Sequence, residues 1–299
     1  MIIVMTGGTS GIGAEALSTI REKKDTKVFV GARNGNTVLP NRAKTLMLDL
    51  SSLDSVRSFA ENIKQDIYPK KIDVLILNAG VQAGKNSEVS SDGYNLTFAV
   101  NHLSHYLLAR LLMPYVAEDG KLFTTTSDSH DDQVIPFGPK TIHISKLAFP
   151  DDSSPKGMAF YAATKLCNIM TADTIYNSLP KESKVQIIAY NPGLTGDTGL
   201  MGKQTKMMKV LVKLLRPIFR FASRFNPVFY MNTAKHSGEV LANLALGKIK
   251  LPAGKNYASL VRGRITFPKP GLLVHDENLK QELWVMSAKM VNLPPEIIL

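Results

Sequence analysis

A tyrosine and a lysine stand four residues apart in the chain, Tyr161 and Lys165. On a helix, this spacing places both side chains on one face, one turn apart. An ammonium group stabilises a nearby phenolate, so the pair is suited to lowering the pKa of the phenol and moving a proton at a substrate oxygen. The same spacing also occurs in ordinary exposed helix pairs, and the catalytic interpretation therefore depends on the polar residues that accompany it.

Two such residues are Ser127 and Asn101. Ser127 lies just beyond a predicted strand at 121–125, and Asn101 stands at the start of a predicted helix. Ser129 is an alternative to Ser127, because residues two apart share one face of a strand if that strand continues. Together with Tyr161 and Lys165, these residues form a candidate acid and base site.

A glycine-rich turn at 6–13 follows the apolar run at 2–5 and leads into a predicted helix. A turn of this kind at a helix N-terminus presents backbone N–H groups to a pyrophosphate. Gly7 permits the tight turn, Gly11 lets the backbone approach the phosphates, and Gly13 lets the helix pack closely on the strand. A purely structural loop is the alternative interpretation.

Arg33 stands after the second predicted strand, where a cofactor with a free ribose 2′-hydroxyl usually meets a carboxylate. A guanidinium matches a 2′-phosphate in charge and in its forked donors, which favours NADP(H) over NAD(H). A solvated surface arginine is the alternative. Asp49 and the segment 78–80 follow the next two strands, and they are expected either to line the adenosine or to serve as turn residues.

Short apolar runs alternate with segments of helical periodicity along the chain, which predicts an α/β fold with a doubly wound parallel sheet and helices on both faces. Such sheets bind ligands at the carboxyl ends of their strands. Predicted strands beyond the first are 27–30, 45–48, 73–77, 121–124 and 185–189, and predicted helices include 53–65 and 101–112. We expect a single domain over 1–299, with an elaboration at 196–231.

This set of motifs resembles the short-chain dehydrogenase/reductase family. The resemblance is carried from residue 2 to about 200 by the glycine turn, the segments 78–80 and 191–193, and Asn101, Ser127, Tyr161 and Lys165. It implies a Rossmann-like fold with a helical lid after the sixth strand. It also implies that Tyr161 is the acid/base, Lys165 lowers its pKa and binds the nicotinamide ribose, Ser127 bonds the reacting oxygen and Asn101 supports a proton relay.

The residues expected to bind the cofactor, NADP(H), follow five of the predicted strands or, in the case of Tyr161 and Lys165, lie on a helix. They are Gly7, Thr9, Ser10, Gly11, Ile12, Gly13, Arg33, Asp49, Leu50, Asn78, Ala79, Gly80, Tyr161, Lys165, Pro192, Gly193 and Thr195.

Further segments are similar to retinol dehydrogenases and light-dependent protochlorophyllide reductases. The segments 101–108 and 128–160 are similar to both, whereas 165–168, 198–200 and 283–291 favour the reductases. Two features depart from the reductases: the segment before Tyr161 is shorter, and Cys167 is the single cysteine.

A formal charge of +11 favours anionic partners such as a phosphorylated cofactor or an anionic lipid surface. Nucleic acid is not expected, because the basic residues are not interleaved with an aromatic platform. The single cysteine excludes an internal disulfide, and the histidines at 102, 105, 130 and 143 do not form a metal pattern. We find no leader or spanning run, and we expect a cytoplasmic protein, peripherally membrane-associated at most, that can form a homo-oligomer.

A basic stretch at 203–224 carries no acidic residue, and its charges recur in steps of three and four. A solvated face, a lid over the substrate and an amphipathic helix on an anionic membrane are the three interpretations, and we favour the lid. Pro217 is expected to kink or divide this helix. The basic residues are Lys203, Lys206, Lys209, Lys213, Arg216, Arg220 and Arg224.

The sequence therefore predicts an NADP(H)-dependent oxidoreductase. Hydride would pass to or from a bulky apolar carbonyl or alcohol, or an activated double bond, with Tyr161 as proton donor or acceptor. Methionines and aromatic residues after the site suggest the apolar substrate. The alternatives are a light-dependent protochlorophyllide reductase-type enzyme and a catalytically silent NADP(H)-binding sensor or scaffold.

Overall fold

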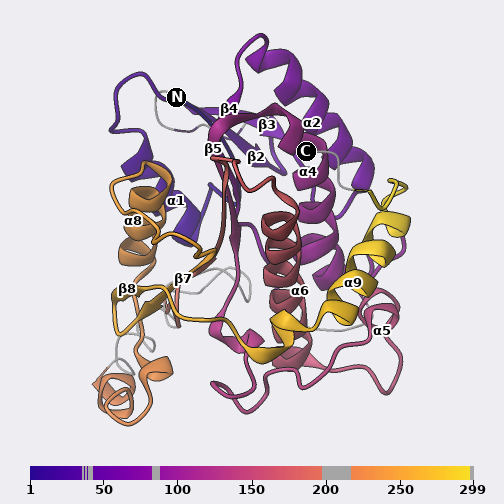
Figure 1. The fold of residues 1–299 in the computed structure, drawn as a ribbon, viewed down its shortest axis with the longest axis vertical. Helices are drawn as coiled ribbons and strands as arrows, with labels where there is room; N and C mark the ends of the chain where they lie inside the picture. The colour runs from indigo at the N-terminus through magenta and orange to yellow at the C-terminus, as the bar shows by residue number, and fades with distance from the viewer. Residues whose placement is uncertain (36, 38, 40–42, 83–87, 197–216, 297–299) are drawn as a thin grey trace.

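The computed structural model describes residues 1–35, 37, 39, 43–82, 88–196 and 217–296 (Figure 1). The strands are β1 Ile2–Thr6, β2 Lys27–Ala32, β3 Ala43–Met47, β4 Ile72–Leu77, β5 Val116–Thr125, β6 Gln186–Asn191, β7 Tyr257–Val261 and β8 Arg264–Thr266. The α-helices are α1 Gly11–Ile20, α2 Leu53–Ile67, α3 Leu96–Phe98, α4 Ser104–Leu112, α5 Ile144–Ala148, α6 Gly157–Ser178, α8 Ala234–Ala245 and α9 Glu277–Met290.

The strands form one sheet in the order β3-β2-β1-β4-β5-β6-β7-β8. All neighbours are parallel except β7 and β8, which are antiparallel. The strand order reverses between β1 and β4, so the turns that follow Thr6 and Leu77 lie side by side at the switch point of the sheet. This is where a doubly wound sheet binds its ligand.

Helices cover both faces of the sheet, as Figure 1 shows, with α1 and α8 on one side and α2, α4, α6 and α9 on the other. Successive residues of β1 point to opposite faces. Ile3 and Met5 belong to the core cluster shared with α1 and α8, whereas Ile2 and Val4 belong to the cluster beneath α2, α4 and α6. The predicted doubly wound α/β fold is therefore confirmed.

Helix α6 lies between the sheet and α9, and most of its side chains are buried. Because its buried side chains are spread around the helix, α6 is typical of a core helix. Asp276 caps the N-terminus of α9 by accepting from Leu279 N at 3.0 Å. On the other side of α9, Trp284 packs edge-on against Tyr106 of α4, with ring centroids 4.8 Å apart.

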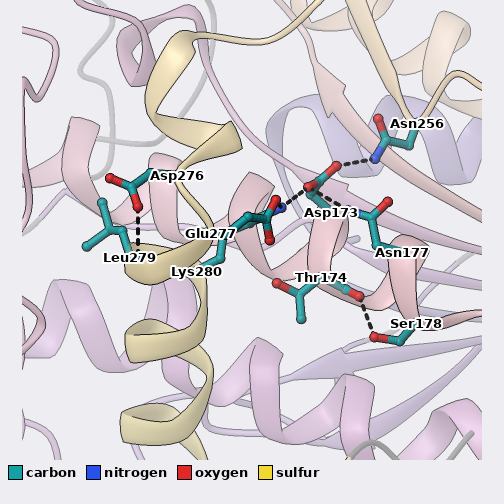
Figure 2. Close-up of polar contacts among 9 residues, drawn as sticks. All are labelled: Asp173, Thr174, Asn177, Ser178, Asn256, Asp276, Glu277, Leu279 and Lys280. Carbon is teal, nitrogen blue, oxygen red and sulfur yellow. Dashed lines mark hydrogen bonds and ion pairs between the residues drawn. The ribbon is translucent and has the colours of Figure 1, made fainter.

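A buried ion pair ties α9 to α6 (Figure 2). Lys280 Nζ lies 2.6 Å from Asp173 Oδ2, and the two side chains are only 4% and 11% exposed. Asn256 and Asn177 donate to the same carboxylate at 2.8 and 3.0 Å. Burial lowers the pKa of Lys280, but hydrogen bonds to Asp173 and Glu277 raise it by more, and the net pKa is raised. Lys280 thus stays charged, and the contacts around Asp173 hold three separate parts of the chain together.

The elaboration at 196–231 is described at residue 196 and from residue 217 onward, and residues 217–222 are helical. Its two ends meet, because Thr195 forms a parallel bridge with Asn232 and Asn232 N donates to Leu194 O at 2.7 Å. The predicted basic positions from Lys203 to Arg216 lie outside the described residues. The lid stays a prediction.

Replacing Lys280 by methionine should lower the free energy of unfolding by about 3–5 kcal/mol, because Asp173 would be left as a buried charge without its counter-ion. Urea unfolding followed by circular dichroism measures this loss. The matched control is Lys44→Met, which breaks the exposed Lys44–Asp66 pair and should cost less than about 1 kcal/mol. Equal losses in the two variants would show that the buried pair does not hold α9.

Candidate active site

The glycine turn after β1 is built so that no side chain fits inside it. Gly7 has φ +67°, and a Cβ there would lie 2.7 Å from Ala79 Cα. A Cβ on Gly13 would lie 2.0 Å from Gly7 O. The exposed Ser10 precedes α1 without making a side-chain cap bond, and Thr9 is also exposed. The first N–H groups of α1, from Gly11 to Gly13, are therefore available to an anion.

The hydroxyl of Thr6 joins this turn to the neighbouring strand end. Thr6 Oγ1 accepts from the backbone N–H groups of Asn78 and Ala79, each at 3.0 Å, and lies 2.9 Å from His105 Nε2. Asn78 Nδ2 donates to Gly7 O at 3.3 Å, and Asn78 Oδ1 accepts from Thr125 Oγ1 at 3.1 Å. The segment 78–80 is thus fixed beside the glycine turn, as its predicted role requires.

Arg33 and Asp49 lie at the ends of β2 and β3. Arg33 is exposed immediately after β2. Asp49 Oδ1 accepts from the backbone and the hydroxyl of Ser51, at 2.9 and 2.7 Å, which fixes the turn after β3, and its expected contact with the adenosine stays a prediction. The neighbouring Leu50 is buried, and its carbonyl accepts from Ser104 Oγ at 2.6 Å.

Asn101 lies in a π-helical turn, Ala99–Leu103, between α3 and α4. Such turns are rare and occur often at functional sites. Asn101 Oδ1 accepts from Val81 N at 2.7 Å, while Nδ2 donates to Val81 O at 2.9 Å and to Thr164 Oγ1 at 3.1 Å. The side chain therefore binds the segment after β4 to the helix that carries Tyr161, and its predicted part in a proton relay stays a prediction.

Tyr161 and Lys165 lie on the buried face of α6, as their spacing predicts. Lys165 Nζ is 5.5 Å from the centroid of the Tyr161 ring and donates to Thr125 O at 3.0 Å. Thr126 Oγ1 donates back to Lys165 O at 2.9 Å. The end of β5 thus fixes helix α6 directly beside the turn that contains Ser127.

Burial is the main influence on the pKa of both Tyr161 and Lys165. Burial raises the pKa of Tyr161, and burial lowers the pKa of Lys165 to about 8. Burial disfavours the charged form of each group, the phenolate of Tyr161 and the ammonium of Lys165. The expected lowering of the phenol pKa by Lys165 stays a prediction.

The structure separates Ser127 from Ser129. Strand β5 ends at Thr125, and a 3-10 turn, Asp128–His130, follows Ser127. Ser129 therefore does not share a strand face with Ser127. Ser127 is half-buried and its Oγ accepts from Ser129 N at 3.3 Å, whereas the buried Ser129 Oγ has no hydrogen-bond partner.

A buried polar contact that the sequence analysis missed connects the Ser127 turn to the end of β6. Asp128 Oδ1 accepts from Asn191 Nδ2, which also donates to Ser259 Oγ at 2.9 Å. Gly193 N donates to Asn191 Oδ1 at 2.9 Å. Burial raises the pKa of Asp128 to about 6, and the bond from Asn191 opposes that rise. The sequence signal that could have indicated this contact is the carboxyl group of Asp128, directly after a candidate catalytic serine.

The turn after β6 carries Pro192, Gly193 and Thr195. Gly193 has φ +65°, and a Cβ there would lie 2.7 Å from Asn232 Nδ2 and 2.8 Å from Leu260 O. Thr195 Oγ1 lies 3.1 Å from Gly193 O, to which it donates, and 3.2 Å from Ser237 Oγ. The turn is therefore rigidly shaped, at the same edge of the sheet as the glycine turn.

The histidines serve the packing of α4 and of the Ser127 turn. Burial lowers the pKa of His102 to about 3 and of His105 to about 4, which keeps both rings neutral. His130 contacts Ser127 O at 2.6 Å through Nδ1 and accepts from Gly271 N at 3.1 Å through Nε2. Within the ranges that the structure describes, no three metal-ligating side chains form a group that could hold an ion.

Comparisons with known proteins show which proteins this chain is similar to. The family model described as short chain dehydrogenase matches residues 1–137. The chain is 25% identical to protochlorophyllide reductase A, chloroplastic, of Oryza sativa subsp. japonica, over 98% of this chain and 81% of the relative. The pea protein, protochlorophyllide reductase of Pisum sativum, is 27% identical over 97% of this chain and 78% of its own length.

A solved structure from Mycobacterium Paratuberculosis superimposes with a TM-score of 0.69 at 21% identity, covering all (100%) of this chain and 95% of its own. The short chain dehydrogenase of Burkholderia cenocepacia J2315, solved in complex with NADP, has a TM-score of 0.56 at 17% identity, covering 81% of this chain and 89% of its own. The resemblance to the short-chain dehydrogenase/reductase family and to protochlorophyllide reductases is confirmed. In the described part of the chain, no helix is both long and apolar enough to cross a bilayer.

The buried lysine should make stability depend on pH. The pKa of Lys165 is about 8 in the folded protein, against 10.5 ordinarily, and the unfolded chain therefore binds more protons between these values. Stability should rise by on the order of 3 kcal/mol from pH 8 to pH 10.5, relative to a Lys165→Met variant. Urea unfolding of both proteins across this range measures the difference. A constant difference would show that Lys165 is not desolvated as the structure indicates.

Proposed function

We propose that this chain, an oxidoreductase of the short-chain dehydrogenase/reductase family, uses NADP(H) to reduce or oxidise a bulky apolar substrate. The observation that carries the proposal is the convergence of four neighbouring strand ends on one site. The ends of β1, β4, β5 and β6 bring the glycine turn, Asn78, Ser127 and Gly193 to one edge of the sheet, where α6 presents Tyr161 and Lys165.

The residues at this edge fit a dinucleotide. The side-chain-free glycine turn and the open first turn of α1 suit a pyrophosphate, and the exposed Arg33 after β2 suits a ribose 2′-phosphate. Gly193 lets the backbone after β6 adopt a conformation that a residue with a Cβ would strain. A turn of this shape suits the nicotinamide end of the cofactor. The complex of the Burkholderia neighbour with NADP supports the same cofactor class.

The bound cofactor would supply or accept the hydride. Tyr161 is protonated, because burial raises its pKa, and is therefore prepared to donate a proton to the oxygen of a carbonyl being reduced. Lys165, at 5.5 Å, would favour the phenolate that remains after that donation. Ser127 would donate a hydrogen bond to the reacting oxygen from the end of β5. Oxidation of an alcohol would require Tyr161 to lose its proton first.

Light-dependent reduction of protochlorophyllide is the second candidate, and the relatives named protochlorophyllide reductases favour it. The shorter segment before Tyr161 and the single, buried Cys167 are the features that differ. Illuminating the protein with protochlorophyllide and NADPH, and recording the pigment spectrum, separates this activity from carbonyl reduction in the dark. A catalytically silent sensor would bind NADPH and turn over neither substrate.

The remaining expectations are kept as predictions. The names of the plant relatives place those proteins in chloroplasts, while a cytoplasmic location and a homo-oligomer are our own predictions for this chain.

Replacing Arg33 by alanine should weaken NADPH binding by about 10- to 100-fold and leave NADH binding nearly unchanged, because only NADPH carries the 2′-phosphate. Quenching of protein fluorescence during titration with each nucleotide measures both affinities. Arg264→Ala, an exposed arginine at the far edge of the sheet, is the matched control. Equal weakening of both nucleotides by Arg33→Ala would contradict the assignment of this arginine.

Replacing Tyr161 by phenylalanine should reduce turnover by about 10²- to 10⁴-fold, since it removes the proton donor while keeping the ring. NADPH affinity should stay close to that of the unmodified protein. Consumption of NADPH at 340 nm, first in a screen of bulky ketones and aldehydes, supplies the assay. Retention of full activity by this variant on the same substrate would show that another group transfers the proton.

A further inference from the structure

Large apolar side chains gather on the exposed surface of the segment 217–230. Ile218 is 64% exposed, Phe221 59%, Phe225 80% and Phe229 43%. In Figure 1 this orange segment projects from one end of the molecule, beyond β8 and away from the sheet. Exposed apolar residues that occur singly need no explanation, but a cluster on a projecting segment indicates an interaction surface.

The surface is also basic. Arg220 and Arg224 are exposed between the aromatic residues, and the sequence holds no aspartate or glutamate from 198 to 238. Phe221 and Phe225 meet edge to face, with centroids 5.6 Å apart, and the Arg224 guanidinium lies 5.9 Å from the Phe221 ring. The Arg224 guanidinium and the two rings therefore lie on the same surface of the segment.

The segment is held in this shape by the turn between β7 and β8. Arg262 donates to Ser223 O from Nε at 3.2 Å and from Nη2 at 2.9 Å, and to Arg224 O at 3.2 Å. Asn226 caps the next turn by accepting from Val228 N at 3.1 Å. Arg262 and Asn226 thus fix the shape of the segment in which the aromatic rings are exposed.

We propose that the residues 217–230, supported by Arg262, dock the protein on the surface of an anionic lipid bilayer. Phenylalanine and isoleucine side chains partition into the acyl boundary, while each arginine near an anionic headgroup layer adds about 1 kcal/mol. A projecting segment can enter a lipid bilayer, because the fluid lipids rearrange around it, whereas a rigid protein partner would need a matching hollow. This surface shares Arg220 and Arg224 with the predicted stripe at 203–224, most of which lies outside the described residues, and adds the aromatic residues Phe225 and Phe229. It does not depend on the proposed catalysis.

Sedimentation of the full chain with vesicles tests the proposal. We expect binding to vesicles of phosphatidylcholine with 30% phosphatidylserine, and at least tenfold weaker binding to phosphatidylcholine alone. The double variant Phe221→Ser/Phe225→Ser should lose at least tenfold in affinity for the anionic vesicles. Its matched control is Tyr68→Ser/Phe149→Ser, which removes two equally exposed rings elsewhere and should bind normally.

Three outcomes would overturn the proposal. The first is failure of the unmodified protein to bind either vesicle, and the second is equal loss in the control variant. The third is a dimer, seen by light scattering, that the Phe221→Ser/Phe225→Ser substitutions dissolve while vesicle binding is unchanged, which would assign the surface to a second copy of the chain. Circular dichroism of each variant shows that a loss of binding is not a loss of folding.

Discussion

A sheet that is buried on both faces can place polar chemistry only where its strands end, and this constraint governs the whole molecule. Apolar side chains along the strands belong to the two cores, so the sheet contributes polar groups to the site at the carboxyl ends of its strands. Adjacent ends are then joined laterally. Thr6 bonds to the segment after β4, Asn78 receives the hydroxyl of Thr125, and Asn191 bonds to both Asp128 and Ser259. The result is a continuous polar seam across five neighbouring strands, in which each strand end fixes the position of the next.

Helix α6 brings Tyr161 and Lys165 to that seam, and burying Lys165 there costs stability. An ammonium group is buried in it, satisfied by a backbone carbonyl of β5 rather than by a carboxylate. A neutral acceptor lets the charge of Lys165 remain free to act on the phenol, whereas a counter-ion would have neutralised it. Burying this ammonium group without a carboxylate lowers the stability of the fold. Proteins commonly keep such a cost where a functional group requires it.

The sequence predicted the strands around the site and the pairing of Tyr161 with Lys165 because both depend on short-range periodicity. It also located the glycine turn, where the φ of Gly7 and the lack of room for a Cβ on Gly13 confirm the steric argument. The π-helical turn at Asn101 could not be predicted, since one extra residue per turn leaves no signal in residue spacing. The contact between Asp128 and Asn191 spans 63 residues, and the direction of the Tyr161 pKa depends on burial, which only the folded arrangement defines.

The ion pair between Asp173 and Lys280 has a consequence for how the protein is made. It joins residues 107 positions apart. Trp284 of α9 also packs against the ring of Tyr106, which lies in α4, still earlier in the chain. Contacts of such long sequence separation form slowly, because the intervening chain must first lose its freedom. During synthesis, the outer face of α6 therefore stays uncovered until residue 280 has emerged from the ribosome. The strands near the N-terminus can condense early, whereas helix α6, which carries Tyr161, becomes enclosed last.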